Sequence, residues 1–160
     1  MDTYAAIASK RDERRYADRP LADEHVERIL DAGRLSGSSR NTQSWEFVLV
    51  SDSRERLAEA VYAPGNVRTA GLVVAIVGSA GSFDVGRCAQ NMMLAAWELG
   101  IVSCPNGVRD ADLAAAICDG DVKIVLSFGH PVTPRTRTRS AEEWSARANR
   151  RPLSELVRRV

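Results

Sequence analysis

The stretch DVGRCAQNMMLAAWELG, residues 84–100, decides the fold. Apolar side chains recur every three or four positions along it, which predicts an amphipathic helix with one buried face. They are Val85, Cys88, Ala89, Met92, Ala96 and Leu99. Gly100 ends the pattern, as glycine commonly does at the C-terminal end of a helix. The pattern therefore predicts one long helix near the centre of the chain.

Apolar runs precede and follow this helix in the sequence. Residues 72–77 (LVVAIV) and 122–128 (VKIVLSF) are rich in β-branched side chains, which is typical of strands covered on both faces. We also expect strands over 46–50 and 101–104, helices over 2–9, 21–32, 54–61 and 110–117, a loop over 36–44 and a turn at 64–66. Alternation of helices and strands excludes an all-α or all-β fold. The pattern predicts an α/β or α+β fold with one sheet.

The length and composition favour one globular domain over residues 1–160, with 44% hydrophobic residues and a net charge of +1. Only Lys10 and Lys123 among the 22 basic residues are lysines, so arginine, which grips phosphate in two places, dominates. A GC-rich genome is the other explanation of this bias. Three cysteines without C-x-x-C spacing indicate buried thiols. No apolar run approaches the ~18 residues of a membrane span, and we expect a cytoplasmic protein.

Five short motifs follow one another along nearly the whole chain. They are KRDER at 10–14, SSRNTQSW at 38–45, the central stretch at 84–100, GHP at 129–131 and RRPL at 150–153. In this order they resemble the motifs of the nitroreductase family, and the SSRNTQSW loop is the most specific of them. Asp12 and Ser44 depart from the family pattern, which usually has serine and proline at these two positions.

The resemblance implies an α+β fold: a three-layer α/β/α sandwich with a mixed central sheet flanked by helices, assembled as a homodimer. It implies FMN as cofactor at the dimer interface, with a deazaflavin as the alternative. The implied activity is that of an NAD(P)H-dependent flavin oxidoreductase, which reduces a nitroaromatic, quinone, enone or flavin by a ping-pong mechanism. The cofactor carries this chemistry, so we expect no catalytic side chain and no metal.

The resemblance also implies the residues that bind the cofactor. They are Lys10, Arg11, Asp12, Arg14, Ser38, Ser39, Asn41, Gln43, Arg68, Asn106, Gly107, Arg150 and Arg151. Lys10 and Arg11 would meet the phosphate and ribityl groups, and Arg150 and Arg151 would close on the phosphate. Arg14 would stabilise negative charge at the pyrimidine edge of the reduced flavin.

The remaining residues of this set have more local roles. The loop with Ser38, Ser39, Asn41 and Gln43 would reach the cofactor from the other subunit. Arg68 would lie near the pyrimidine edge, a place for which Asn66 competes. The turn at residues 105–107 would offer a main-chain N–H to flavin N5. Each group also has a plain alternative: a solvated arginine, a capped loop or an ordinary turn.

Two other functions compete with this interpretation. A non-catalytic module that binds or sequesters flavin is favoured by the short connection over residues 101–121, which leaves no room for a roof over the cofactor. A nucleic-acid arm would use the C-terminal arginines, namely Arg135, Arg137, Arg139, Arg147, Arg150 and Arg151. Glu142 and Glu143 interrupt that charge, so we expect no nucleic-acid partner.

Overall fold

The computed structural model describes residues 2–133 and 139–160, which form two compact units. The larger unit holds the described residues from 11 to 133, and the smaller unit holds residues 2–10 and 139–160. Arg135 and Arg137 of the suggested nucleic-acid arm lie outside the described residues. One domain over 1–160 stays a prediction.

The larger unit is built on a sheet with the strand order β1-β2-β4-β3. The strands are β1 (Glu46–Leu49), β2 (Leu72–Val77), β3 (Val102–Asn106) and β4 (Val122–Gly129), each close to its predicted range. Every pair of neighbouring strands is antiparallel. The expected mixed sheet is therefore wrong for these strands, and parallel pairing is limited to one bridge between Asp12 and Ser103.

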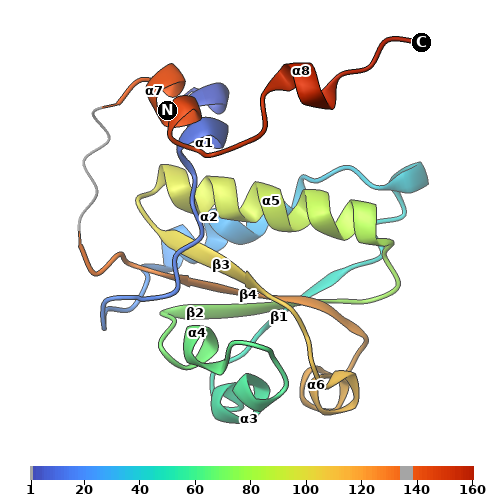
Figure 1. Ribbon diagram of the computed structural model, residues 1–160. Coiled ribbons are helices and arrows are strands. Elements are labelled where there is room, and N and C mark those ends of the chain that lie inside the picture. The colour runs from blue at the N-terminus through green and yellow to red at the C-terminus, as the bar shows by residue number, and fades with distance from the viewer. Residues whose placement is uncertain (1, 134–138) are drawn as a thin grey trace. The chain divides into compact units, whose positions relative to one another are not determined.

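Helices cover both faces of this sheet, as Figure 1 shows. Helices α2 (Asp23–Arg34) and α5 (Ser82–Glu98) lie on one face, and α3 (Arg54–Glu59), α4 (Pro64–Arg68) and α6 (Ala111–Cys118) on the other. Strand β2 is buried along its whole length because alternate side chains enter the two apolar clusters on opposite faces. The three-layer α+β fold is thus confirmed. Helix α4 replaces the predicted turn at 64–66, since Pro64 is well placed in the first turn of a helix.

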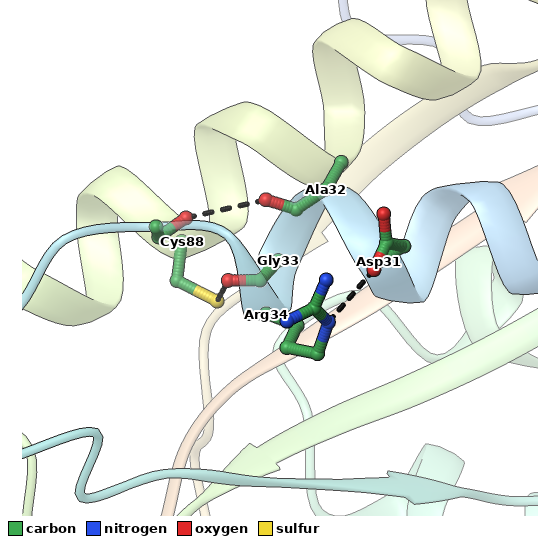
Figure 2. A network of polar contacts seen from close by, with 6 residues as sticks. Asp31, Ala32, Gly33, Arg34 and Cys88 are labelled. Carbon is green, nitrogen blue, oxygen red and sulfur yellow. Dashed lines mark hydrogen bonds and ion pairs between the residues drawn. The ribbon is translucent and has the colours of Figure 1, made fainter.

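Helices α2 and α5 approach each other closely at Gly33. A Cβ atom there would lie 2.8 Å from Cζ of Phe47 and 2.9 Å from Sδ of Met92, so a larger residue would force these side chains to shift. The Cys88 thiol donates a hydrogen bond to the Gly33 carbonyl over 3.6 Å, and Arg34 pairs with Asp31 on the outer side of α2 (Figure 2). The central helix is therefore buried, as predicted.

The smaller unit contains α1 (Thr3–Ser9), α7 (Ala141–Ala146) and α8 (Leu153–Leu156). The Asp2 side chain caps α1, and a capping box formed by Ser140 and Glu143 begins α7. Helices α1 and α7 pack together. No helix in the described part of the chain is long and apolar enough to cross a membrane.

Candidate functional site

Residues 11–16 lie beside the first residues of β3. Asp12 forms the parallel bridge with Ser103, and the Glu13 N–H donates to the Ser103 carbonyl over 3.0 Å. Arg11 is half-buried, whereas Asp12 and Arg14 are exposed. No described residue pairs with the Arg14 guanidinium. An exposed arginine on a fixed main chain is suited to an anion that arrives from solution.

Tyr16 anchors the far end of this segment. Its ring covers Gly129, where a Cβ atom would lie 2.7 Å from ring carbons. Its hydroxyl donates to the Glu13 carbonyl over 2.9 Å and lies 2.7 Å from Ser127 Oγ. Burial raises the pKa of Tyr16 well above its ordinary value, so the hydroxyl stays neutral. Arg14 is thus held between two fixed points, Glu13 and Tyr16.

A buried pair of carboxamides lies at the end of β3. Asn66 Nδ2 donates to Asn106 Oδ1 over 2.8 Å. Asn106 Nδ2 lies 3.0 Å from Ser127 Oγ, 3.1 Å from the Cys104 carbonyl and 3.2 Å from the Val125 carbonyl. The Asn106 side chain is therefore fully used inside the protein, and only its main chain could touch a ligand.

The main chain beyond this pair is also fixed. The Gly107 carbonyl accepts from the Tyr62 N–H over 3.1 Å, and Val108 bridges Val61. The Gly107 N–H makes no hydrogen bond with any described residue. An unused main-chain donor at an exposed glycine is open to a ligand that approaches closely.

The loop between α2 and β1 is strained. Arg40, Asn41 and Gln43 all have positive φ, at 54°, 56° and 48°. Residues other than glycine are destabilised by about 1–2 kcal/mol each when their backbone adopts this left-handed conformation. The Ser38 hydroxyl accepts the Gln43 N–H over 2.9 Å and compensates part of this cost. Strain of this kind collects at functional sites.

Two residues of the central helix hold this loop. Asp84 Oδ2 accepts the Ser39 N–H over 3.0 Å, and Asn91 Nδ2 donates to Ser36 Oγ over 2.8 Å. Both residues belong to the motif at 84–100, so that motif supports the loop as well as the core.

A cavity of about 610 Å³ lies between the N-terminal half of α5 and strands β3 and β4. Its apolar lining includes Val85, Ala89, Met93, Pro105 and Ile124, and Lys123 stands at the same wall. A Cβ atom at Gly86 would meet nothing within 4 Å, so this glycine keeps the floor of the cavity open. The volume falls within the 300–1,000 Å³ typical of small-molecule sites.

Other predicted residues are not among those that line this cavity. Arg68 pairs with Glu55 over 2.8 Å on the protein surface, and such exposed pairs contribute little stability. Lys10, Arg150 and Arg151 belong to the smaller unit. Lys10 caps α1 and is half-buried, Arg150 donates to the Ala148 carbonyl over 3.0 Å, and Arg151 pairs with Glu155 over 3.2 Å.

The larger unit brings together only some of the predicted cofactor-binding residues. The Glu13 carbonyl, which directly precedes Arg14, is joined to Asn106 through the buried polar groups around Ser127. The loop at residues 38–43 is tied to the first turn of α5, whereas Glu13 meets β3 just after α5 ends (Figure 1). At 1.5 Å per residue, the helix between these ends is about 20 Å long. One chain therefore places its strained loop and its Arg14 at opposite ends of α5.

Sequence reasoning missed the residues that shape the cavity. Gly86 carried a usable signal, because a glycine inside a strong helical pattern costs about 1 kcal/mol and needs a reason. Met93 and Lys123 carried none, since either side chain is ordinary in a core helix or a strand. Among the described residues no group of three potential ligands could hold a metal ion.

Parts of this chain are similar in sequence to known proteins. The model of the nitroreductase family matches residues 7–79 and 78–130. A protein of Archaeoglobus fulgidus, provisionally named NADH dehydrogenase/NAD(P)H nitroreductase, is 32% identical over 114 residues, which cover 64% of this chain and 65% of that protein. One of Methanothermobacter thermautotrophicus with the same name is 29% identical over 118 residues, covering 68% and 62%. The matched region thus spans less than two thirds of these relatives.

A solved structure is similar over almost its whole length. It is a provisionally named nitroreductase from Desulfovibrio desulfuricans in complex with FMN, with a TM-score of 0.79, 24% identity, and coverage of 98% of this chain and 96% of that one. A structure with this fold and of similar length is therefore known with FMN bound.

Proposed function

Because this chain belongs to the nitroreductase family, we propose that it binds FMN and acts as an NAD(P)H-dependent oxidoreductase on a small organic acceptor. The observation that carries this proposal is the 610 Å³ cavity lined by Pro105, which lies two residues before Gly107, whose N–H makes no hydrogen bond with any described residue. When bound, the flavin would take a hydride from NAD(P)H and give the electrons to a nitroaromatic, quinone, enone or second flavin in a ping-pong cycle.

The residues of this chain fit FMN in three respects. The apolar lining formed by Ala89, Met93 and Pro105 suits a flat ring system. The open floor at Gly86 leaves room for that ring. Arg14 offers a guanidinium that pairs with no residue in the described part of the chain, and this group is well suited to a negative phosphate or a negatively charged ring edge.

Each binding residue would then act by position or charge. Arg14 would hold the negative charge that develops at the pyrimidine edge, while Lys10 and Arg11 would meet the phosphate and ribityl groups. Gly107 would donate its N–H at the hydride-accepting edge of the ring. Arg150 and Arg151 would close on the phosphate, and Asp12 would accept from a ribityl hydroxyl or pair with Arg11 or Arg14.

The site would be completed by a second copy of the chain. Ser38, Ser39, Asn41 and Gln43 are held about 20 Å along α5 from the Arg14 end of the helix, so a single chain does not close both groups around one cofactor. A homodimer would bring the strained loop of one copy to Arg14 of the other copy at one cofactor. A cytoplasmic location remains a prediction from the sequence.

Mixed dimers test this arrangement. An Arg14→Ala chain and an Asn41→Gly chain would each lose flavin affinity when alone. Mixed in equal amounts and re-equilibrated, they would regain about a quarter of the sites, because every heterodimer carries one intact site. No recovery, together with a dimeric mass, would count against loops that act across the interface.

Turnover tests the activity. Under anaerobic conditions the protein reconstituted with FMN should oxidise more than one equivalent of NADPH or NADH per flavin only when a quinone or nitroaromatic is present. Bound flavin without turnover would favour the alternative, a flavin-binding module without catalysis.

A further inference from the structure

A continuous chain of buried polar groups connects two parts of the proposed site. It runs from the Glu13 carbonyl to the Tyr16 hydroxyl (2.9 Å), to Ser127 Oγ (2.7 Å), to Asn106 Nδ2 (3.0 Å). The Asn106 Oδ1 atom then accepts from Asn66 over 2.8 Å. Arg14 directly follows Glu13 in the sequence and Gly107 directly follows Asn106, so the network joins the main-chain segments that carry these two residues.

These polar side chains lie where apolar ones would cost less. Asn66 and Asn106 are only 6% and 2% exposed, and Ser127 is fully buried. A buried polar group costs free energy unless every partner is in place, so a satisfied network permits one arrangement and penalises others. The core thus exchanges stability for a defined geometry at this point.

The network fixes the main chain just before Gly107. The Asn106 amide lies within hydrogen-bond distance of carbonyls on both β3 and β4, at the last pair of the β3–β4 ladder. Asn66 reaches Asn106 from α4, on the face of the sheet opposite α5. The next residue, Gly107, donates its N–H to none of the residues that the structure describes.

We propose that Asn66 and Asn106 are positioning residues that set the Gly107 N–H at a fixed place relative to Arg14. This inference rests on the proposed function, since the ligand held between these two groups would be the flavin ring. One group would meet the hydride-accepting edge and the other the pyrimidine edge. A displacement of about 1 Å in such a pair can change a rate about 100-fold.

Asn66→Ala tests this role, because it removes the donor to Asn106 without touching the cavity. In the apoprotein we expect amide hydrogen exchange at Tyr62, whose N–H donates to the Gly107 carbonyl, to rise about tenfold as the turn loosens. In the FMN-loaded protein the rate of flavin reduction by NADPH should fall at least about tenfold, while the dissociation constant of NADPH stays unchanged.

Two further variants separate positioning from a general loss of stability. Val67→Ala truncates a fully buried neighbour on α4 and leaves the network intact, so it should lower stability while Tyr62 exchange and flavin reduction stay as in the wild type. Tyr16→Phe keeps the ring on Gly129 and removes only the hydroxyl. It should slow flavin reduction even if Asn66→Ala does not fold.

The outcomes distinguish this inference from the proposed function. Wild-type protein that takes up no FMN would overturn the proposed function and this role with it. Wild-type protein that is reduced normally, with Asn66→Ala and Tyr16→Phe reduced at the same rate, would overturn the inference alone. An effect of Val67→Ala as large as that of Asn66→Ala would do the same.

Discussion

The main-chain N–H of Ser39 donates to the Asp84 carboxylate over 3.0 Å, which ties the loop between α2 and β1 to the first turn of α5. The carboxylate also lies at a helix N-terminus, where negative charge is favourable. Its side chain is only 15% exposed, so solvent weakens this hydrogen bond little. The strained loop is therefore held from the core helix.

Asp84→Ala should lower the free energy of unfolding by about 1.5–3 kcal/mol, the range for a hydrogen bond to a charged group. Urea unfolding followed by circular dichroism measures this change. Asp112→Ala is the matched control, because Asp112 occupies the first turn of α6 and is exposed. Equal losses in the two variants would mean that only the helix dipole matters at Asp84.

Gln43→Gly should raise the free energy of unfolding by roughly 0.5–1 kcal/mol, because glycine adopts a φ of 48° without strain. Thr42→Gly in the same loop should lower it, since Thr42 has φ −69° and gains nothing from glycine. Thermal unfolding of both variants checks the pair. A stabilising Thr42→Gly would show that loop flexibility, rather than strain relief, decides the result.

Gly86→Ala should have opposite effects on stability and on binding. The helix gains up to about 1 kcal/mol, since nothing lies within 4 Å of the new Cβ atom. FMN affinity should fall because the added methyl group enters the cavity floor. Gly65→Ala in α4, equally unobstructed but outside the cavity lining, should leave the affinity unchanged. Titration by flavin fluorescence would refute the cavity assignment if Gly86→Ala bound FMN as the wild type does.

Cys88 should make stability depend on pH in alkaline solution. Burial raises the pKa of this thiol from 9.0 to about 11, so the folded chain keeps a proton that the unfolded chain releases. The contribution is complete below pH 9 and is lost as the pH rises to 11. Between pH 9 and pH 11 the free energy of unfolding of the wild-type protein should therefore fall by roughly 1–3 kcal/mol more than that of Cys88→Ala. Parallel slopes would exclude a buried neutral thiol.

Arg14→Ala should weaken FMN binding about tenfold or more, because a charge-assisted contact is lost. Arg15→Ala is the control, since the neighbouring arginine is exposed and belongs to no predicted contact. Isothermal titration with FMN compares the two. Equal affinities of both variants and the wild type would remove Arg14 from the site.

The sequence allowed the strands and the long helix to be predicted because their apolar patterns are local. Strand β2 was predicted without error, since its unbroken apolar run needs two covered faces. Helix α4 was missed because Pro64, Gly65 and Asn66 are also turn residues, and packing decided between the two outcomes. The mixed sheet was wrong because a chain pattern does not specify strand direction.

The candidate site was predictable only where a motif coincides with it. The motifs allowed Arg14 and the loop at residues 38–43 to be predicted as candidate site residues. The inward orientation of the Asn66 side chain depends on Asn106, forty positions away in the sequence. Nothing in the local pattern at Arg68 signals its surface pair with Glu55. Contacts between distant segments carry no local periodicity, so only the fold reveals them.

The most direct test of a flavin oxidoreductase is the absorption spectrum of the FMN-reconstituted protein before and after NADPH is added without oxygen. We expect flavin absorption bands at about 370 and 450 nm that bleach when NADPH is added. Protein that takes up no FMN, or bound flavin that keeps its bands with both NADPH and NADH, would contradict the account.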